Sequence, residues 1–334
     1  MRPALPAFVW SLAVLACADE LPSYEGLAAV EFRDAMTIRP LDEPRGLDPT
    51  RIALGARLFH DTRLSADHTI SCASCHDLAS GGVDHRRTSI GIGGAVGPIN
   101  APTVLNASLS FRQFWDGRAA TLEAQIDGPT QAATQMGSTW PAIVAAVASD
   151  PAYVRAFAAD YPDGITPDNV RNAIATFERS LVTVDAPFDR WLRGEPDANG
   201  ADARAGYAMF LDYGCASCHQ GVGIGGNMYQ RLGVLGDYFA DRGDETTVDQ
   251  GRYNVTHLEE DRHVFRVPSL RNVAATAPYF HDGSAPDLPS AVRTMGHYQL
   301  GRDLDPSEID ALVAFLQALT GVLPPAAHLA DVPS

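Results

Sequence analysis

Two short stretches of the chain place a pair of cysteines directly before a histidine. They are "SCASCHD", with Cys72, Cys75 and His76, and "GCASCHQ", with Cys215, Cys218 and His219. The spacing C-x-x-C-H is the attachment signature of c-type haem, in which both thiols bond to the haem and the adjacent histidine becomes an axial ligand of the iron. A redox or zinc site is the alternative, but no third cysteine pair is present to complete a zinc centre. We therefore expect two c-type haems with His76 and His219 as proximal iron ligands.

The sixth ligand decides what each haem does, because its identity sets the redox potential and the reactivity of the iron. For the second haem the candidate is Met295, and His297 and Tyr298 are alternatives close by in the sequence. A methionine ligand would raise the potential and close the iron to substrates, as suits a haem that receives electrons. Met136 follows His76 at a spacing that would also suit a methionine ligand. On spacing alone, both haems can be six-coordinate and the protein a plain electron carrier.

The elements around the motifs are predicted to be helices, several of which begin at a proline. Asp48 and Pro49 open "LDPTRIALGARLFHD", and Thr166 and Pro167 open "TPDNVRNAIATFERSLVT", as a helix cap and a first helical residue. Further helical patterns are "STWPAIVAAVAS", "DPAYVRAFAADY" and "DPSEIDALVAFLQALTG", whereas residues 77–110 are rich in glycine and read as loop. A helix before the motif and a proline-capped helix at the end recur in both halves. This pattern indicates a mainly α protein built by tandem duplication of a small haem domain.

The chain is expected to have four parts. These are a signal peptide at 1–18, an N-terminal arm at 19–47, a first haem domain at 48–194 and a second at 195–323, with "LRGEPDANGADA" as the linker. The apolar run from Ala4 to Ala16 follows one arginine and is too short to span a bilayer, which is typical of an export signal. The letters "VLAC" also resemble a lipoprotein signal that would end before Cys17 and leave it lipidated. Both alternatives predict export.

The composition is strongly acidic. The formal net charge is −16, with 41 acidic residues against 25 basic ones, and every basic residue is an arginine. Such a surface disfavours nucleic acid and anionic membranes and suits a partner with a basic docking face. A length of 334 residues accommodates two domains, each with its own core.

Over roughly residues 44–321 the chain resembles the bacterial di-haem cytochrome c peroxidase and MauG family. The segments that carry the resemblance are "LGARLFHDTRLS", "SCASCHDLASGG", "NAPTVLNAS", "QFWDGRAATLEAQ", "LVTVDAPFDRWLRG", "GCASCHQGVGIGG", "VPSLRNVAATAPYFHDGS" and "MGHYQLGRDL". The resemblance implies two cytochrome c-like α domains, with a peroxidatic haem in the first. It also implies a second haem that receives electrons from a small c-type cytochrome or cupredoxin, a Ca²⁺ between the domains, and a homodimer.

Individual residues carry over from the family by position. Met295 matches the axial methionine of the peroxidase branch, since MauG has a tyrosine there. Trp115 matches a tryptophan between the haems, and Gln125 matches a polar residue of the peroxide pocket. Oxygen ligands suit a hard cation, and the implied calcium ligands are Asn100 and the backbone carbonyls of Thr276 and Pro278.

The chain departs from the family pattern at two positions. In "SIGIGG", Ile92 replaces the histidine that blocks the peroxidatic iron in many members, so the first haem is expected to be open from the start. His85 is an alternative ligand for this iron. Gln135 stands where the peroxidases have a glutamate that moves the proton needed to split the O–O bond, and an amide cannot carry that proton. Glu123 or a chain of water molecules is the alternative carrier.

We therefore expect a periplasmic cytochrome c peroxidase that reduces H₂O₂ to water, with Gln125, Gln135 and Trp115 as its catalytic residues. One alternative is a MauG-like enzyme that oxidises residues of a partner protein. The open first iron favours it and Met295 disfavours it. The other is a non-enzymatic electron-transfer cytochrome with Met136 on the first iron, which the change at position 135 favours.

Overall fold

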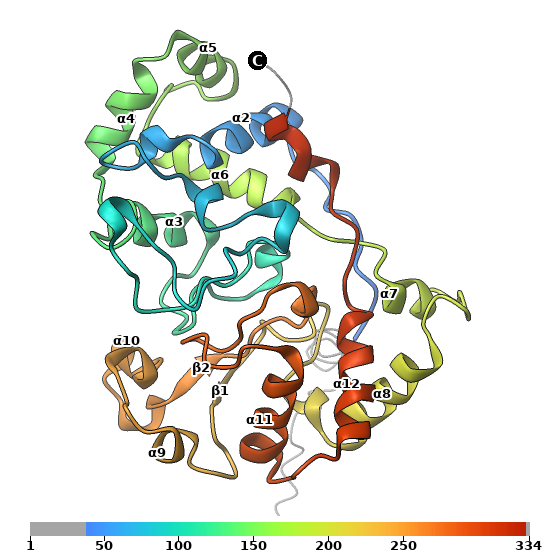
Figure 1. The fold of residues 1–334 in the computed structure, drawn as a ribbon. Helices are drawn as coiled ribbons and strands as arrows, with labels where there is room; N and C mark the ends of the chain where they lie inside the picture. Colours follow the sequence, from blue (N-terminus) through green and yellow to red (C-terminus); the bar gives the residue numbers. More distant parts are fainter. Residues whose placement is uncertain (1–37, 332–334) are drawn as a thin grey trace, which may run out of the picture.

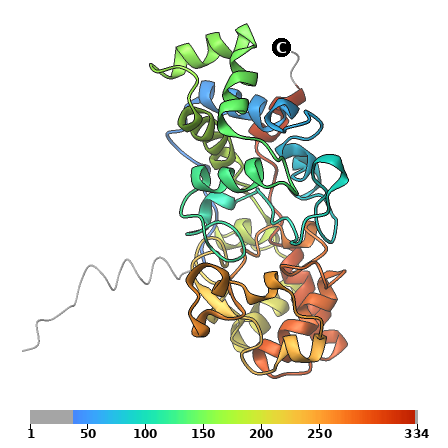
Figure 2. The ribbon, with the colours of Figure 1, turned by 90° about the vertical axis from the view of Figure 1, so that its left-hand side faces the viewer.

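The computed structural model describes residues 38–331, so the predicted signal peptide, Cys17 and most of the arm lie outside the described residues. Figures 1 and 2 show two helical units stacked one above the other. Each unit has its own hydrophobic core, built from residues between 54 and 181 in the first and between 188 and 319 in the second. The described strands form one antiparallel pair, β1 (Tyr229–Arg231) with β2 (Val264–Arg266). The prediction of a mainly α protein with two tandem domains is confirmed.

Helices of the first unit surround its core. They are α2 (Pro49–Phe59), α3 (Leu122–Gln131), α4 (Trp140–Ala148), α5 (Pro151–Asp160) and α6 (Pro167–Ser180). The side chain of Asp48 caps α2 by accepting the Thr50 N–H, and Thr166 caps α6 by accepting the Asn169 N–H. Sequence analysis predicts these helices except α3, which contains Pro129. Residues 77–110 are mainly loop, as predicted, with three short 3₁₀ turns.

The second unit has a larger number of short elements. Its helices are α7 (Pro187–Leu192), α8 (Ala201–Asp212), α9 (Tyr238–Arg242), α10 (Tyr253–Thr256), α11 (Leu288–Leu300) and α12 (Pro306–Gln317). The predicted linker is shorter than expected, because its last residues already belong to α8. Phe188 and Trp191 of α7 pack with the second core. By packing, α7 therefore belongs to the second unit, although the expected boundary follows residue 194.

The same helix crossing occurs in both units. In the first, Gly55 of α2 lies against the Ala173 carbonyl of α6, and a Cβ added to the glycine would overlap that oxygen. In the second, Gly206 of α8 lies in the same way against the Ala311 carbonyl of α12. The helix before each C-x-x-C-H motif thus packs against the last helix of its unit with backbones in contact. The same helix crossing in both units is consistent with the tandem duplication expected from the sequence.

Three extended segments connect the units along one edge of the molecule (Figure 1). They are the start of the described chain, the connection from α6 to α7, and the chain after α12. The Val322 N–H donates to the Val184 carbonyl at 2.8 Å, which pairs two of these segments. The C-terminal segment then returns to the first unit, where Leu323 and Leu329 pack against its core. The second domain is expected to span residues 195–323, but from Leu323 onward the chain packs on the first unit.

Among residues 38–331, no single helix is long and apolar enough to cross a membrane, although α4 and α5 together meet the length and composition criteria across a bend of 104°. The buried residues of these two helices, Ile143, Val147, Tyr153 and Phe157, belong to the core of the first unit.

Candidate functional site

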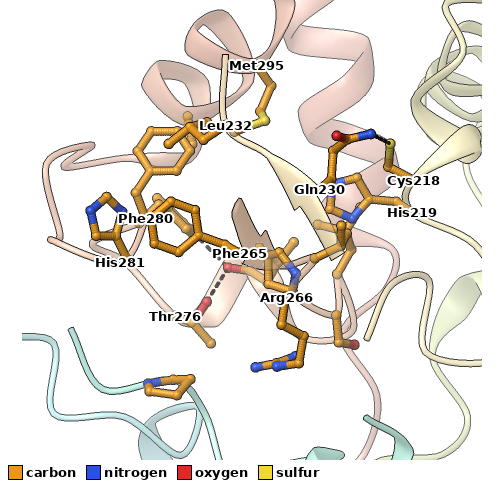
Figure 3. A pocket seen from close by; sticks show the side chains of 18 of the residues that line it. Cys218, His219, Gln230, Leu232, Phe265, Arg266, Thr276, Phe280, His281 and Met295 are labelled. Carbon is orange, nitrogen blue, oxygen red and sulfur yellow. Dashed lines mark hydrogen bonds between the residues drawn. The ribbon is translucent and has the colours of Figure 1, made fainter. Parts of the chain in front are cut away.

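A cavity of about 400 Å³ lies in the second unit and is lined in part by loops of the first. Figure 3 shows part of its lining, with Met295 entering from α11 and His219 from the loop after α8. Most of the site residues predicted for the second haem and the calcium ion line this one cavity: Cys215, Cys218, His219, Met295, Trp115, Asn100, Thr276 and Pro278. The structure therefore brings together residues that are up to about 200 positions apart in the chain.

The second motif forms a tight turn that presents its histidine to the cavity. The Cys218 and His219 N–H groups both donate to the Cys215 carbonyl, at 3.2 and 3.0 Å, and both thiols are free. Burial lowers the pKa of His219 to about 4, so its imidazole is neutral at physiological pH. Its buried Nδ1 has no hydrogen-bond partner among the described residues. Two free thiols and a neutral imidazole beside a mainly apolar cavity fit a c-type haem.

The three candidates for the sixth ligand of this haem point in different directions. Met295 lines the cavity and packs near Trp115 in a small apolar cluster. His297 is exposed and its Nδ1 lies 2.7 Å from a carboxylate oxygen of Asp303. The Tyr298 hydroxyl donates to Asp241 at 3.2 Å. The positions of these side chains favour Met295, and its ligand role stays a prediction.

The predicted calcium residues lie where the two units meet. Asn100 is buried, and its side-chain amide nitrogen donates to the Arg86 carbonyl at 3.0 Å. The backbone carbonyl of Asn100 accepts the Trp115 indole N–H at 3.0 Å. Thr276 and Pro278 belong to the neighbouring segment of the second unit and line the same cavity. This set is oxygen-only and so has the ligand chemistry of Ca²⁺.

The first motif has the same local turn as the second. The His76 N–H donates to the Cys72 carbonyl at 3.0 Å, and the His76 Nδ1 lies 3.1 Å from the Gly82 carbonyl, to which it donates. Burial lowers the pKa of His76, which favours the neutral ring that a metal binds. Cys72 packs against the first core, and both Cys72 and Cys75 are free thiols. The first unit therefore presents the same two kinds of haem-binding group.

His85, the alternative ligand for the first iron, is engaged elsewhere. Its Nδ1 lies 2.9 Å from the Ala277 carbonyl, and its Nε2 lies 2.7 Å from the Ser80 hydroxyl and 3.0 Å from the Ser80 carbonyl. Both ring nitrogens therefore have oxygen partners within the protein, and the role of His85 as an iron ligand stays a prediction. The contact with Ala277 instead joins the loop of the first unit to the predicted calcium segment.

Ile92 and Gln135, the two departures from the family pattern, lie side by side. The Ile92 N–H donates to the Gln135 carbonyl at 2.8 Å, and the Ile92 side chain lies against Gly137. Met136 is buried in the first core. Gln125 is half-buried on α3, and no hydrogen bond joins its side chain to that of Gln135 among the described residues. The structure thus brings together the two loops that contain Ile92 and Gln135. The catalytic roles of Gln125 and Gln135 stay predictions.

Two carboxylates of the first unit differ in their environment. Burial would raise the pKa of Glu123, but its hydrogen bonds and the charge of Arg179 together outweigh burial and lower it, so Glu123 is ionised and paired with Arg179 at 2.8 Å. Glu178 on α6 is 5% exposed and its Oε2 has no partner. Burial raises the pKa of Glu178 to about 8. Sequence reasoning misses Glu178, although a glutamate within the buried face of an amphipathic helix is a usable signal.

Comparison with known proteins places the chain in a family. The family model for di-haem cytochrome c peroxidase matches residues 49–197, and the model for cytochrome c matches residues 203–320. A cytochrome c551 peroxidase of Nitrosomonas europaea is 46% identical over 272 residues, which cover 81% of this chain and 80% of the relative. The chain belongs to the di-haem cytochrome c peroxidase family. The curated cytochrome c peroxidases of this family are oxidoreductases that act on peroxide. One haem-protein family model matches each unit, which supports one haem per unit.

Other relatives cover both branches of the family. A cytochrome c peroxidase of Escherichia coli K12 is 49% identical over 289 residues, which are 86% of this chain but 62% of that protein. The chain therefore spans less than two thirds of the length of this relative. A methylamine utilization protein MauG of Methylorubrum extorquens is 34% identical, covering 89% of this chain and 86% of the relative. Among solved structures, a MauG-like protein associated with microbial copper homeostasis has a TM-score of 0.75 at 28% identity, covering 94% and 96% of the two chains.

Proposed function

We propose that this chain is an exported cytochrome c peroxidase that works in the periplasm. It reduces H₂O₂ at the first haem with electrons that enter through the second. The observation that carries the proposal is the shared cavity, because it gathers His219, Met295 and Trp115 at the border between the units. The curated peroxidases among the relatives support the same activity. The electron donor is a small c-type cytochrome or a cupredoxin with a basic face, which suits the net charge of −16.

In the second unit the residues bind and orient the electron-transfer centre. Haem iron, when bound, supplies the one-electron chemistry. Cys215 and Cys218 would attach the group, and His219 and Met295 would ligate its iron. Trp115 lines the cavity at the border between the units, where its indole N–H donates to the backbone carbonyl of Asn100.

In the first unit the residues position peroxide and manage protons. Reduction of H₂O₂ to two waters consumes two electrons and two protons. Ile92 supplies no imidazole to this iron, so the first haem would be open in the oxidised protein. Gln135 and Gln125 orient the peroxide by hydrogen bonds but donate no titratable proton, so water molecules deliver the protons.

The first measurement is an EPR spectrum of the fully oxidised protein with both haems present. We expect one high-spin signal from the haem of His76 and one low-spin signal from the other. Two low-spin signals would contradict an open first haem. Steady oxidation of a reduced small cytochrome c by H₂O₂ then tests the peroxidase activity itself.

The substitution Ile92→His tests the origin of the open state. A histidine in this loop is expected to ligate the first iron, which converts the high-spin EPR signal to low-spin and makes peroxide turnover depend on prior reduction. Ile92→Leu is the control and should keep the high-spin signal. A high-spin signal in both variants would contradict the assignment of this loop to the iron.

We also propose that Asn100 and the carbonyls of Thr276 and Pro278 bind Ca²⁺ between the units, in a protein that forms a homodimer. Removal of Ca²⁺ by a chelator is expected to change the haem spectra or the association state measured by ultracentrifugation. Unchanged spectra and an unchanged association state would contradict the calcium site.

A second candidate function is MauG-like oxidation of residues on a partner protein. The absence of a blocking histidine at Ile92 favours it, as does the MauG relative with 34% identity. Met295 favours peroxidase activity instead. A long-lived peroxide-oxidised state combined with no turnover of a small cytochrome would support this second function.

A further inference from the structure

Arg266, at the end of β2, is a buried cation without an anionic partner. It is 6% exposed, and no carboxylate lies within ion-pair distance of it among the described residues. Its Nε donates to the Phe114 carbonyl and its Nη1 to the Ser110 hydroxyl, both at 3.1 Å. A guanidinium carries five N–H donors, so these two bonds leave three of them, including both on Nη2, without a protein acceptor. Burial lowers the pKa of Arg266 only to about 10, so it remains charged at neutral pH.

The second buried arginine of the described chain provides a direct comparison. Arg271 is 1% exposed, and its Nη1 lies 2.6 Å from a carboxylate oxygen of Asp189, which is fully buried. Its other donors reach the carbonyls of Val222 and Arg39. A charge taken out of water requires a counter-charge or a full set of hydrogen bonds. Arg271 satisfies this requirement within the protein, whereas Arg266 does not.

The unpaired donors of Arg266 belong to the cavity that holds the second motif. Arg266 lines this cavity together with His219 and Met295. In Figure 3 its side chain extends away from Met295, towards the loops of the first unit. The hydrogen bonds to Ser110 and Phe114 place the guanidinium at this border. An anion bound at this end of the cavity would complete the shell of Arg266.

We propose that Arg266 binds a propionate carboxylate of the haem held by His219. A c-type haem has two propionates, which its thioether bonds and axial ligands leave free. A guanidinium is suited to a carboxylate because two parallel N–H donors can bind its two oxygens. The inference rests on the proposed function only because it places a haem in this cavity. Arg266 then has two roles. It neutralises the propionate, and it links the haem to the loop of Trp115, whose carbonyl accepts the Arg266 backbone N–H at 2.8 Å.

A positive charge beside the haem stabilises the reduced iron, which carries one positive charge fewer than the oxidised iron. Loss of this charge is therefore expected to lower the midpoint potential of the second haem. The test is spectroelectrochemical titration of the protein with both haems attached, comparing wild type, Arg266→Gln and Arg266→Lys. For Arg266→Gln we expect about a tenfold shift of the one-electron equilibrium towards the oxidised form, or about 59 mV. Arg266→Lys should lower the potential by less than half as much, because the charge is retained.

The matched control is Arg293→Gln, which removes the same charge from the exposed side of α11, two residues from Met295. Equal potentials in Arg266→Gln and Arg293→Gln would overturn the proposal, because a general charge effect would then suffice. Resonance Raman spectroscopy provides a second readout, since the propionate bending band should shift in Arg266→Gln and in Arg266→Lys but not in Arg293→Gln. If Arg266→Gln yields no protein with haem attached, Arg266→Lys decides. A shifted band then supports the contact, and an unshifted band overturns it.

Neither readout depends on peroxide turnover. A wild-type protein that lacks peroxidase activity would contradict the proposed function while leaving the assignment of Arg266 testable. Conversely, an active peroxidase in which Arg266→Gln changes neither the potential nor the Raman band would overturn only the assignment of Arg266.

Discussion

Position 135 carries an amide, Gln135, where a carboxyl group could transfer the proton needed to split the O–O bond of hydrogen peroxide. The neighbouring Ile92 donates its backbone N–H to the Gln135 carbonyl, so the two loops meet. We expect Gln135→Glu to raise the steady-state rate of cytochrome oxidation by H₂O₂ at least tenfold, since positioned acid–base groups contribute about 10²–10⁴-fold. Gln131→Glu, which adds the same charge at an exposed position near the end of α3, is the control. Equal rates in all three proteins would show that residue 135 does not handle the proton.

Glu178 is expected to make stability depend on pH. Burial raises its pKa in the folded protein to about 8, from 4.5 in a solvated chain. The folded state therefore binds the proton more tightly, so its stability contribution is fully present below pH 4.5 and is lost as pH rises through about 8. We expect the midpoint of urea unfolding to fall between these pH values, and Glu178→Gln to flatten the decline. The exposed Glu260→Gln should keep the wild-type slope. An unchanged slope in Glu178→Gln would place the titration elsewhere.

At the residue scale, the sequence predicts the groups that bind haem because their chemistry depends on local spacing. His76 and His219 follow directly from the C-x-x-C-H motifs, and a single turn fixes each geometry. Arg266 and Glu178 escape sequence analysis for the opposite reason. Their importance comes from burial without a partner, which depends on packing between segments far apart in the chain.

At the scale of elements, the crossing of α8 and α12 depends on the absence of a side chain at Gly206. An added methyl group would overlap the Ala311 carbonyl, which belongs to a helix backbone and cannot turn away. We expect Gly206→Ala to destabilise the protein by about 1–3 kcal/mol, the usual cost of overpacking. Denaturant unfolding measures this loss. Gly200→Ala is the control, because a Cβ there meets no atom within 4 Å; it replaces the glycine N-cap of α8 and should cost less, about 0.5 kcal/mol. A similar loss in both variants would contradict a close helix contact at Gly206.

Several predicted helices share a clear start signal, whereas two of the helices that sequence analysis misses, α3 and α11, contain a residue that disfavours a helix. A proline after a capping Asp or Thr opens α2 and α6, and both helices form where the sequence places them. In α3, Pro129 interrupts the expected pattern, yet buried residues on one face keep the segment helical. In α11, Asp287 caps the helix as usual, but Gly296 weakens the helical pattern. Tertiary packing overrides local propensity in both cases, and sequence patterns alone cannot reveal this.

At the scale of the whole molecule, the last segment of the chain fastens the two units together. After α12, Val322 pairs with the connection between the units, and Leu323 and Leu329 reach the core of the first unit. The end of the second unit thus covers part of the first. This arrangement makes the first unit, where we propose that peroxide is reduced, depend for its stability on a segment that follows the second unit.

The double substitution Leu323→Ser with Leu329→Ser tests this dependence. Both side chains are partly buried, so their loss should destabilise the first unit by on the order of 1–3 kcal/mol. Thermal unfolding followed at the high-spin absorption bands of the first haem should then shift to lower temperature, while the bands of the second haem change less. Val322→Ser, at a side chain that is 61% exposed, is the control and should leave both transitions in place. Equal shifts for both haems in the double variant would show instead that the two units unfold as one cooperative body.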